Sequence, residues 1–182
     1  MKRISRWQPR TRQVVNWIVT SASVLLCLLI MPTRLPGMEL LGIAPNWLLI
    51  WVVAWSVKRT PFQGALAGLV LGMLQDGMTS PDPTHALSLA VVGYVTARIQ
   101  KHRYIQEDFI SIALIVFGMA ALSETITALQ FSFVPGRNLV EIWTYQQRIA
   151  LASAILSSLW APVMYYPLNM WWEQIDFLEQ SQ

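Results

Sequence analysis

The sequence predicts an all-α integral membrane protein, a bundle of six transmembrane helices with both chain ends in the cytoplasm (N-in/C-in). Hydrophobic residues make up 54% of the 182 residues and charged residues only 13%, against roughly 25% charged in soluble domains. The apolar residues are gathered in runs that approach the ~20 residues needed to cross a bilayer. The basic residues flank these runs, so the net charge of +3 indicates orientation in a membrane rather than nucleic-acid binding.

One membrane domain is predicted over residues 14–168. A basic cytoplasmic N-terminus, residues 1–13, precedes it, and a cytoplasmic tail, residues 169–182, follows it. The expected spans cover residues 14–31, 43–57, 62–76, 84–99, 109–131 and 145–168. Because the second, third and fourth spans are short and closely spaced, four or five crossings remain an alternative.

The first span follows a basic stretch that contains no acid, an arrangement that secretory signal peptides share. However, the run Val14–Met31 is longer than most signal-peptide cores, and no clear A-x-A cleavage site follows it. A retained transmembrane helix is therefore the favoured interpretation. Pro32, Pro36 and Gly37 then break the chain before the second span.

Helix-breaking and basic residues mark the next boundaries. The second span opens at Pro45-Asn46 and ends at Lys58-Arg59, and the fourth follows a turn containing Pro81 and Pro83. The fifth and sixth spans are long apolar runs that need no such markers. Cys27 is the only cysteine, so no internal disulfide can form.

The third span carries Gly64, Gly68 and Gly72, one glycine at every fourth position. Residues four apart share one helix face, so the glycines form a smooth groove where another helix can approach closely. In water each glycine would weaken the helix by roughly 1 kcal/mol relative to alanine, whereas in lipid no solvent competes for the backbone. The groove could pack within the bundle or receive a partner's transmembrane helix.

The distribution of basic residues supports an even number of crossings. With the N-terminus inside, ten of the 13 Lys and Arg residues fall on the cytoplasmic side and three on the other. The cytoplasmic ten are Lys2, Arg3, Arg6, Arg10, Arg12, Lys58, Arg59, Arg98, Lys101 and Arg103; the outer three are Arg34, Arg137 and Arg148. Those that border spans two to four could be topology determinants that attract anionic lipid, or a docking surface for a cytoplasmic protein.

Catalytic motifs are missing from the sequence. It contains no HExxH, GxSxG or P-loop motif, and His85 and His102 are expected on opposite sides of the membrane without metal-ligand partners. Asp76 and Glu124 are the only acids close to spans, so a paired-acid intramembrane enzyme is a distant alternative. We expect no enzymatic activity, no cofactor and no metal.

Four polar residues are expected in the outer half of the membrane: Asn46, Asp76, Glu124 and Arg148. An ionised group in lipid costs at least a few kcal/mol without a partner, so Arg148 is expected to offset Glu124 or Asp76. The cluster could hold helices together, form a partner-docking cavity, or form a solute pocket. Trp47, Trp51 and Trp55, on one face of the second helix, could likewise form a packing or lipid surface or an aromatic ligand cage.

The order of these motifs resembles the rod-shape-determining MreD family. Pro45-Asn46 opens an apolar helix, a basic pair and Pro61 lead into the glycine helix ending in Leu74-Gln75-Asp76, and a helix with Gly93-Tyr94 ends in a basic cluster. The resemblance spans roughly residues 14–168 and is best between 45 and 103.

The resemblance implies a non-enzymatic scaffold of the elongation machinery in the bacterial inner membrane. Such a scaffold would bind MreC and act indirectly with MreB and with the RodA/penicillin-binding-protein synthase complex, helping to position peptidoglycan synthesis. Membrane lipid is expected as a partner and nucleic acid is not. The family is also similar in fold to the S components of energy-coupling-factor transporters. That similarity leaves the solute-binding subunit of a vitamin transporter as the alternative function.

Overall fold

The computed structural model describes residues 9–33, 38–40, 42–79, 84–102, 109–133 and 139–180. Its six helices, in chain order, are α1 (Pro9–Ile30), α2 (Trp47–Ser56), α3 (Pro61–Met78), α4 (His85–His102), α5 (Phe109–Ser132) and α6 (Leu139–Gln180). Most of the predicted basic N-terminus lies outside the described residues, as do the turn from Pro81 to Pro83, Arg34, Arg103 and Arg137.

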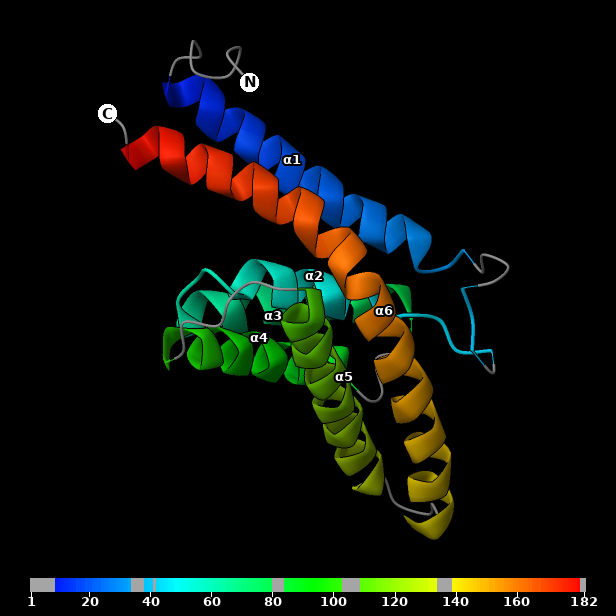
Figure 1. Cartoon of the computed structure of the whole chain (residues 1–182). Helices are drawn as coiled ribbons and strands as arrows, with labels where there is room; N and C mark the ends of the chain where they lie inside the picture. The colour runs from blue at the N-terminus through cyan, green and yellow to red at the C-terminus, as the bar shows by residue number, and fades with distance from the viewer. Residues whose placement is uncertain are drawn as a thin grey trace.

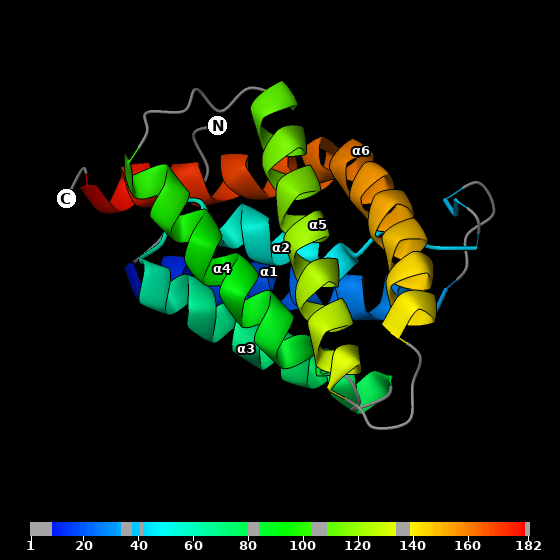
Figure 2. The same ribbon diagram turned by 90° about the horizontal axis from the view of Figure 1, so that it is seen from below.

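The short helix α2 lies at the centre of the bundle. Every residue of α2 except Trp55 is buried, and α2 contacts each of the other five helices. α3 and α4 lie side by side along it, α1 runs beside the C-terminal half of α6, and α5 pairs with the N-terminal half of α6 (Figures 1 and 2). A run of apolar residues with no polar face suits a helix that is surrounded on all sides.

Helix α2 begins four residues later than predicted because Asn46 caps it. The Asn46 Oδ1 atom accepts a hydrogen bond from the Leu49 backbone nitrogen at 3.0 Å, the usual N-cap geometry. The resulting helix of 10 residues extends only ~15 Å, about half the hydrocarbon thickness of a bilayer. α2 therefore has the length of a buried core helix. The residues before and after it would have to complete any crossing of the membrane at this segment.

Helix α6 is longer than the predicted span at both ends. It continues through Pro162 and Pro167, and Figure 1 shows it bending along its orange part. Proline removes one backbone hydrogen bond and bends a helix without ending it where neighbouring helices hold the chain. Beyond residue 168, Trp172 and Ile175 are buried, and Trp172 packs edge-on against Trp51. The beginning of the predicted tail is thus part of the bundle.

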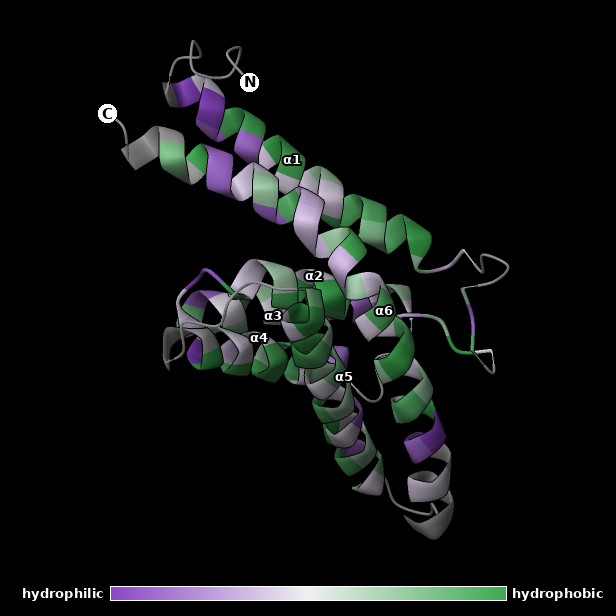
Figure 3. Cartoon of the chain, in the orientation of Figure 1, coloured by the Kyte–Doolittle hydropathy of each residue, from purple (hydrophilic) through white to green (hydrophobic). Residues whose placement is uncertain are grey.

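Three of the described helices are long and apolar enough to cross a membrane, over Arg10–Ile30, Phe109–Ser132 and Gln146–Ile175. Two shorter apolar helices cover Trp47–Ser56 and His85–Ile99. The all-helical fold is confirmed, whereas six crossings of a membrane stay a prediction. Figure 3 shows the first turns of α1 as hydrophilic and most of the rest of that helix as hydrophobic.

The first turns of α1 and the last turns of α6 lie at the same end of the bundle (Figures 1 and 2). Trp171 Nε1 donates a hydrogen bond to Asn16 Oδ1 at 3.3 Å and so joins the two helices near this end. The arrangement is compatible with both chain ends on one side of a membrane. Which side that is stays a prediction.

Candidate functional site

The three glycines of α3 pack directly against α4. A Cβ atom added at Gly68 would collide with the backbone of Leu89, one at Gly64 with Gly93, and one at Gly72 with the backbone of Ala86. Such close approach is the small-xxx-small packing of membrane helices. Of the two interpretations of the groove, the structure has internal packing. The contact sets the end of α3 beside the start of α4.

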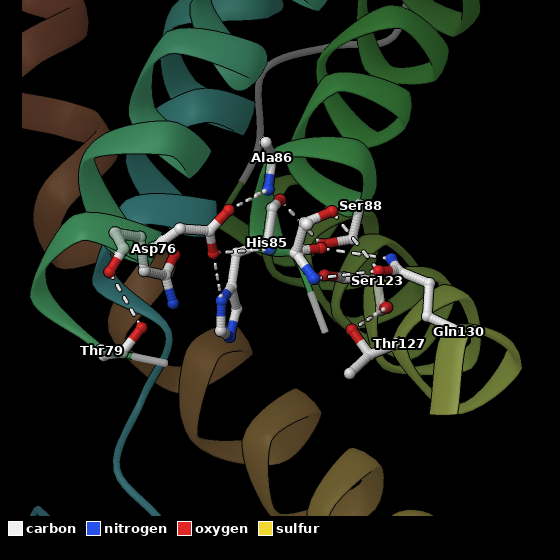
Figure 4. Close-up of polar contacts among 10 residues, drawn as sticks. Asp76, Thr79, His85, Ala86, Ser88, Ser123, Thr127 and Gln130 are labelled. Carbon is white, nitrogen blue, oxygen red and sulfur yellow. Dashed lines mark hydrogen bonds and ion pairs between the residues drawn. The ribbon is translucent and has the colours of Figure 1, made fainter. Parts of the chain in front are cut away.

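Asp76 caps the start of α4 from the neighbouring helix. Its Oδ1 atom lies 2.7 Å from both the backbone nitrogen and Nδ1 of His85, and Oδ2 accepts from the Ala86 backbone nitrogen at 3.3 Å (Figure 4). The first backbone N–H groups of a helix have no partner within the helix, and the helix dipole favours negative charge there. Asp76 therefore joins α3 to α4, and the backbone N–H groups at the start of α4 stabilise its carboxylate.

Gln130 of α5 holds the residue that precedes α4. Its Nε2 atom donates to the Thr84 carbonyl oxygen at 3.1 Å, and its Oε1 atom accepts from the Thr84 backbone nitrogen at 3.0 Å (Figure 4). One turn earlier on α5, the Thr127 hydroxyl donates a hydrogen bond to the Ser123 carbonyl oxygen at 3.1 Å. The polar face of α5 is thus turned toward the start of α4.

Glu124 is paired with Gln146 rather than with Arg148. The Gln146 Nε2 atom donates to Glu124 Oε2 at 2.8 Å, and Gln146 is buried while Arg148 is exposed. Residues two apart on a helix face different directions, so only one of the two side chains can point at α5. The expected Arg148 partnership with Glu124 or Asp76 is not found among the described residues, and Gln146 takes its place.

A cavity of about 260 Å³ lies where α2, α3, α4, α5 and α6 meet. Asn46 and Glu124 line it, together with His85, Gln75 and Trp47. The Asn46 backbone nitrogen donates to the Ser157 hydroxyl of α6 at 3.0 Å, which fixes this wall. Two of the four predicted polar residues thus meet in one cavity. Asp76 and Arg148 are not among the lining residues, although Asp76 contacts His85, which is one of them.

Sequence reasoning missed four polar residues that line this cavity: Gln75, Ser123, Thr127 and Ser153. It also missed Gln146, which fixes Glu124. Glutamine, serine and threonine are uncharged and form no recognisable motif here, so a search for charged or catalytic residues passes over them. The available signal was their position, because a glutamine within an apolar run needs a partner or a cavity. Gln75 also directly precedes Asp76.

The tryptophans of α2 serve packing. Trp47 and Trp51 are buried, the Trp47 ring lies 5.7 Å from that of Trp160, and Trp51 Nε1 donates to the Ser23 hydroxyl at 2.8 Å. Trp55 is partly exposed and stacks on Trp51 with 6.1 Å between ring centroids. Of the two interpretations of this stripe, the contacts support packing over an aromatic cage.

A second, larger cleft of about 630 Å³ opens between α1, α2, α3 and the end of α6. Gln13, Asn16 and Thr20 line it from α1, at spacings of three and four that place them on one helix face. Arg59 lines it from the end of α2, where its guanidinium lies 5.4 Å from the centroid of the Trp55 ring. The polar stripe of α1 thus faces a cleft beside α2 and α3.

The described residues contain no group of three or more His, Cys, Asp and Glu side chains that could hold a metal ion. His85 is engaged by Asp76, and the side chain of His102 lies outside the described part of the chain. The functional geometry therefore consists of a glycine-packed helix pair, a polar cavity at its end, and the cleft beside α1.

Comparison with known proteins adds one match. A family model described as rod shape-determining protein MreD matches residues 11–172, nearly the whole chain. No curated protein and no solved structure matches the chain, and the expected likeness to the S components of energy-coupling-factor transporters stays a prediction. The match extends from the first turn of α1 to the part of α6 that packs on α2, so it includes all six helices described above. The chain belongs to the MreD family of rod shape-determining membrane proteins.

Proposed function

We propose that this chain is a non-enzymatic scaffold of the cell-elongation machinery, spanning the bacterial inner membrane several times. It binds MreC, and through MreC it helps to position peptidoglycan synthesis together with MreB and the RodA/penicillin-binding-protein synthase complex. The observation that carries the proposal is the family match over residues 11–172, because family membership ties the chain to rod shape. In this proposal both chain ends face the cytoplasm.

The short connections between the helices support the scaffold proposal. Four residues separate α2 from α3, and the described helices account for most of the chain. Large soluble domains are therefore lacking between the described helices, and a partner within the membrane has to recognise helix faces and their rims. A protein of this kind acts by holding partners at a fixed depth and orientation.

The cleft beside α1 is the surface that we assign to a partner's single transmembrane helix. Its polar stripe, Gln13, Asn16 and Thr20, is unlike a surface that faces only lipid. Polar side chains in membrane helices contribute to association by bonding to neighbouring helices. The glycine groove cannot serve this purpose, because α4 occupies it.

A vitamin-transporter subunit is the second candidate, and the polar cavity where α2, α3, α4, α5 and α6 meet is the observation in its favour. Pockets that enclose drug-sized ligands measure roughly 300–1,000 Å³. The cavity, at about 260 Å³, falls below that range and suits a smaller group than a vitamin. The scaffold proposal therefore stands first.

Complementation tests the proposed function directly. Cells depleted of their own MreD become rounded if the elongation machinery fails, and expression of this chain should restore rod shape. A restored rod shape without any effect on vitamin uptake supports the scaffold. Vitamin uptake that depends on the chain, with no effect on cell shape, would support the transporter instead.

A further inference from the structure

The cavity between α2 and α6 contains a buried hydrogen-bond acceptor with nothing to accept. Gln75 is 6% exposed and lines the cavity, and its Oε1 atom has no hydrogen-bond partner within the described residues. A buried polar atom left without a partner costs about 1–3 kcal/mol, and native structures contain few of them. Such an atom in a cavity wall indicates a missing donor.

The same cavity has a second hydrogen-bond acceptor in its wall. The carboxylate of Glu124 lines it and receives one hydrogen bond, from Gln146 to Oε2, which leaves Oε1 available to a further donor. Among the described residues that line the cavity there is no Lys or Arg. An ionised carboxylate inside a membrane protein is stabilised by a cation placed beside it.

The lining selects the kind of cation. A metal ion is disfavoured, because the described residues hold no cluster of three His, Cys, Asp or Glu ligands. A primary ammonium group has three N–H donors, so it can bond to Gln75 Oε1 and to the Glu124 carboxylate together.

We infer that this cavity binds a small organic cation with a primary ammonium group, of the size of ethanolamine. The volume of about 260 Å³ accommodates such a group and is small for a drug-sized molecule. The ammonium group can belong to a free amine or to the headgroup of a phosphatidylethanolamine lipid. This site is independent of MreC binding, because the cleft assigned to the partner helix is lined by other residues.

Thermal unfolding of the full chain in mild detergent tests the site, with ethanolamine as the probe. Saturating ethanolamine should raise the unfolding midpoint by about 2–4 °C. Choline has the same charge but no N–H donor and should not. Stabilisation by choline equal to that by ethanolamine, or none by either, overturns the proposal.

Two variants locate the effect. Gln75→Leu removes the unpaired acceptor, and Glu124→Gln removes the charge while keeping a similar shape; both should abolish the shift. Gln147→Leu is the matched control, because Gln147 is exposed and lies outside the cavity lining. A shift that persists in both cavity variants places ethanolamine elsewhere and contradicts the inference.

Native mass spectrometry of protein taken from nanodiscs separates the two sources of the ammonium group. Phosphatidylethanolamine retained by the unmodified chain and lost from Gln75→Leu identifies the lipid headgroup. A thermal shift with free ethanolamine, without retained lipid, identifies a soluble amine. If neither the retained lipid nor the thermal shift is seen, the site is contradicted. That outcome leaves MreC copurification, and with it the scaffold proposal, unaffected.

Discussion

The Asp76 carboxylate lies 2.7 Å from both the backbone nitrogen and the ring Nδ1 of His85, and this contact ties the end of α3 to the start of α4. The two helices are also packed backbone to backbone at Gly64, Gly68 and Gly72. α3 and α4 therefore form one unit, fixed along its length by glycines and at one end by a carboxylate cap. The polar cavity lies at this capped end.

Replacement of Asp76 tests the cap. Asp76→Ala leaves the backbone N–H groups of His85 and Ala86 without acceptors, and we expect the free energy of unfolding to fall by about 0.5–2 kcal/mol. Asp76→Asn keeps one acceptor and should lose less. Thermal unfolding in detergent measures both. If Asp76→Ala is as stable as the unmodified chain, the cap contributes nothing.

Enlarging a glycine tests the seam between α3 and α4. Gly68→Leu places a side chain where the Leu89 backbone lies, and overpacking of this kind costs about 1–3 kcal/mol or more. Gly118→Leu is the control, because a Cβ atom at Gly118 meets nothing within 4 Å. Protein level in membranes and thermal midpoint report the difference. Equal behaviour of the two variants would show that the close approach at Gly68 is unimportant.

The partner of Glu124 can be identified by paired substitutions. Gln146→Leu removes the donor to Glu124 Oε2, and we expect a loss of about 1–3 kcal/mol because the half-buried carboxyl group then loses its hydrogen bond from α6. Arg148→Ala, on the exposed face of the same helix, should change stability by no more than about 0.5 kcal/mol. The opposite ranking would restore Arg148 as the partner expected from the sequence.

A reporter fused after Gln182 tests the topology. We expect it in the cytoplasm, because the first turns of α1 and the last turns of α6 lie together and the basic residues of the N-terminus favour the inside. Alkaline phosphatase and green fluorescent protein fusions give complementary signals for the two sides. An active phosphatase fusion at this position would place the tail outside and reverse the orientation.

The sequence predicts best the helix that coincides with one long, mainly apolar run. The fifth span was expected over 109–131 and the helix covers Phe109–Ser132. The start of α2 differs from the prediction because Asn46 is the N-cap and the helix begins after it. The extent of α6 differs because Pro162 and Pro167 bend the helix without ending it.

The polar cavity depends on tertiary contacts that hydropathy does not encode. Asn46 and Glu124 could be identified because a charged or amide group near a span needs a partner. Gln146 and Arg148 are two residues apart on α6 and therefore point in different directions. Which of them faces Glu124 depends on how α6 is rotated about its axis, and hydropathy does not predict that rotation. Gln75 becomes notable only once the surrounding helices enclose its side chain and leave its oxygen without a donor.

Copurification of MreC with the tagged chain from mild detergent tests the scaffold most directly. We expect the unmodified chain and Ser21→Leu to retain MreC, because Ser21 is exposed on α1 and does not line the cleft, whereas Thr20→Leu should release most of it. If the unmodified chain does not retain MreC under conditions in which it stays folded, the proposed scaffold function is contradicted.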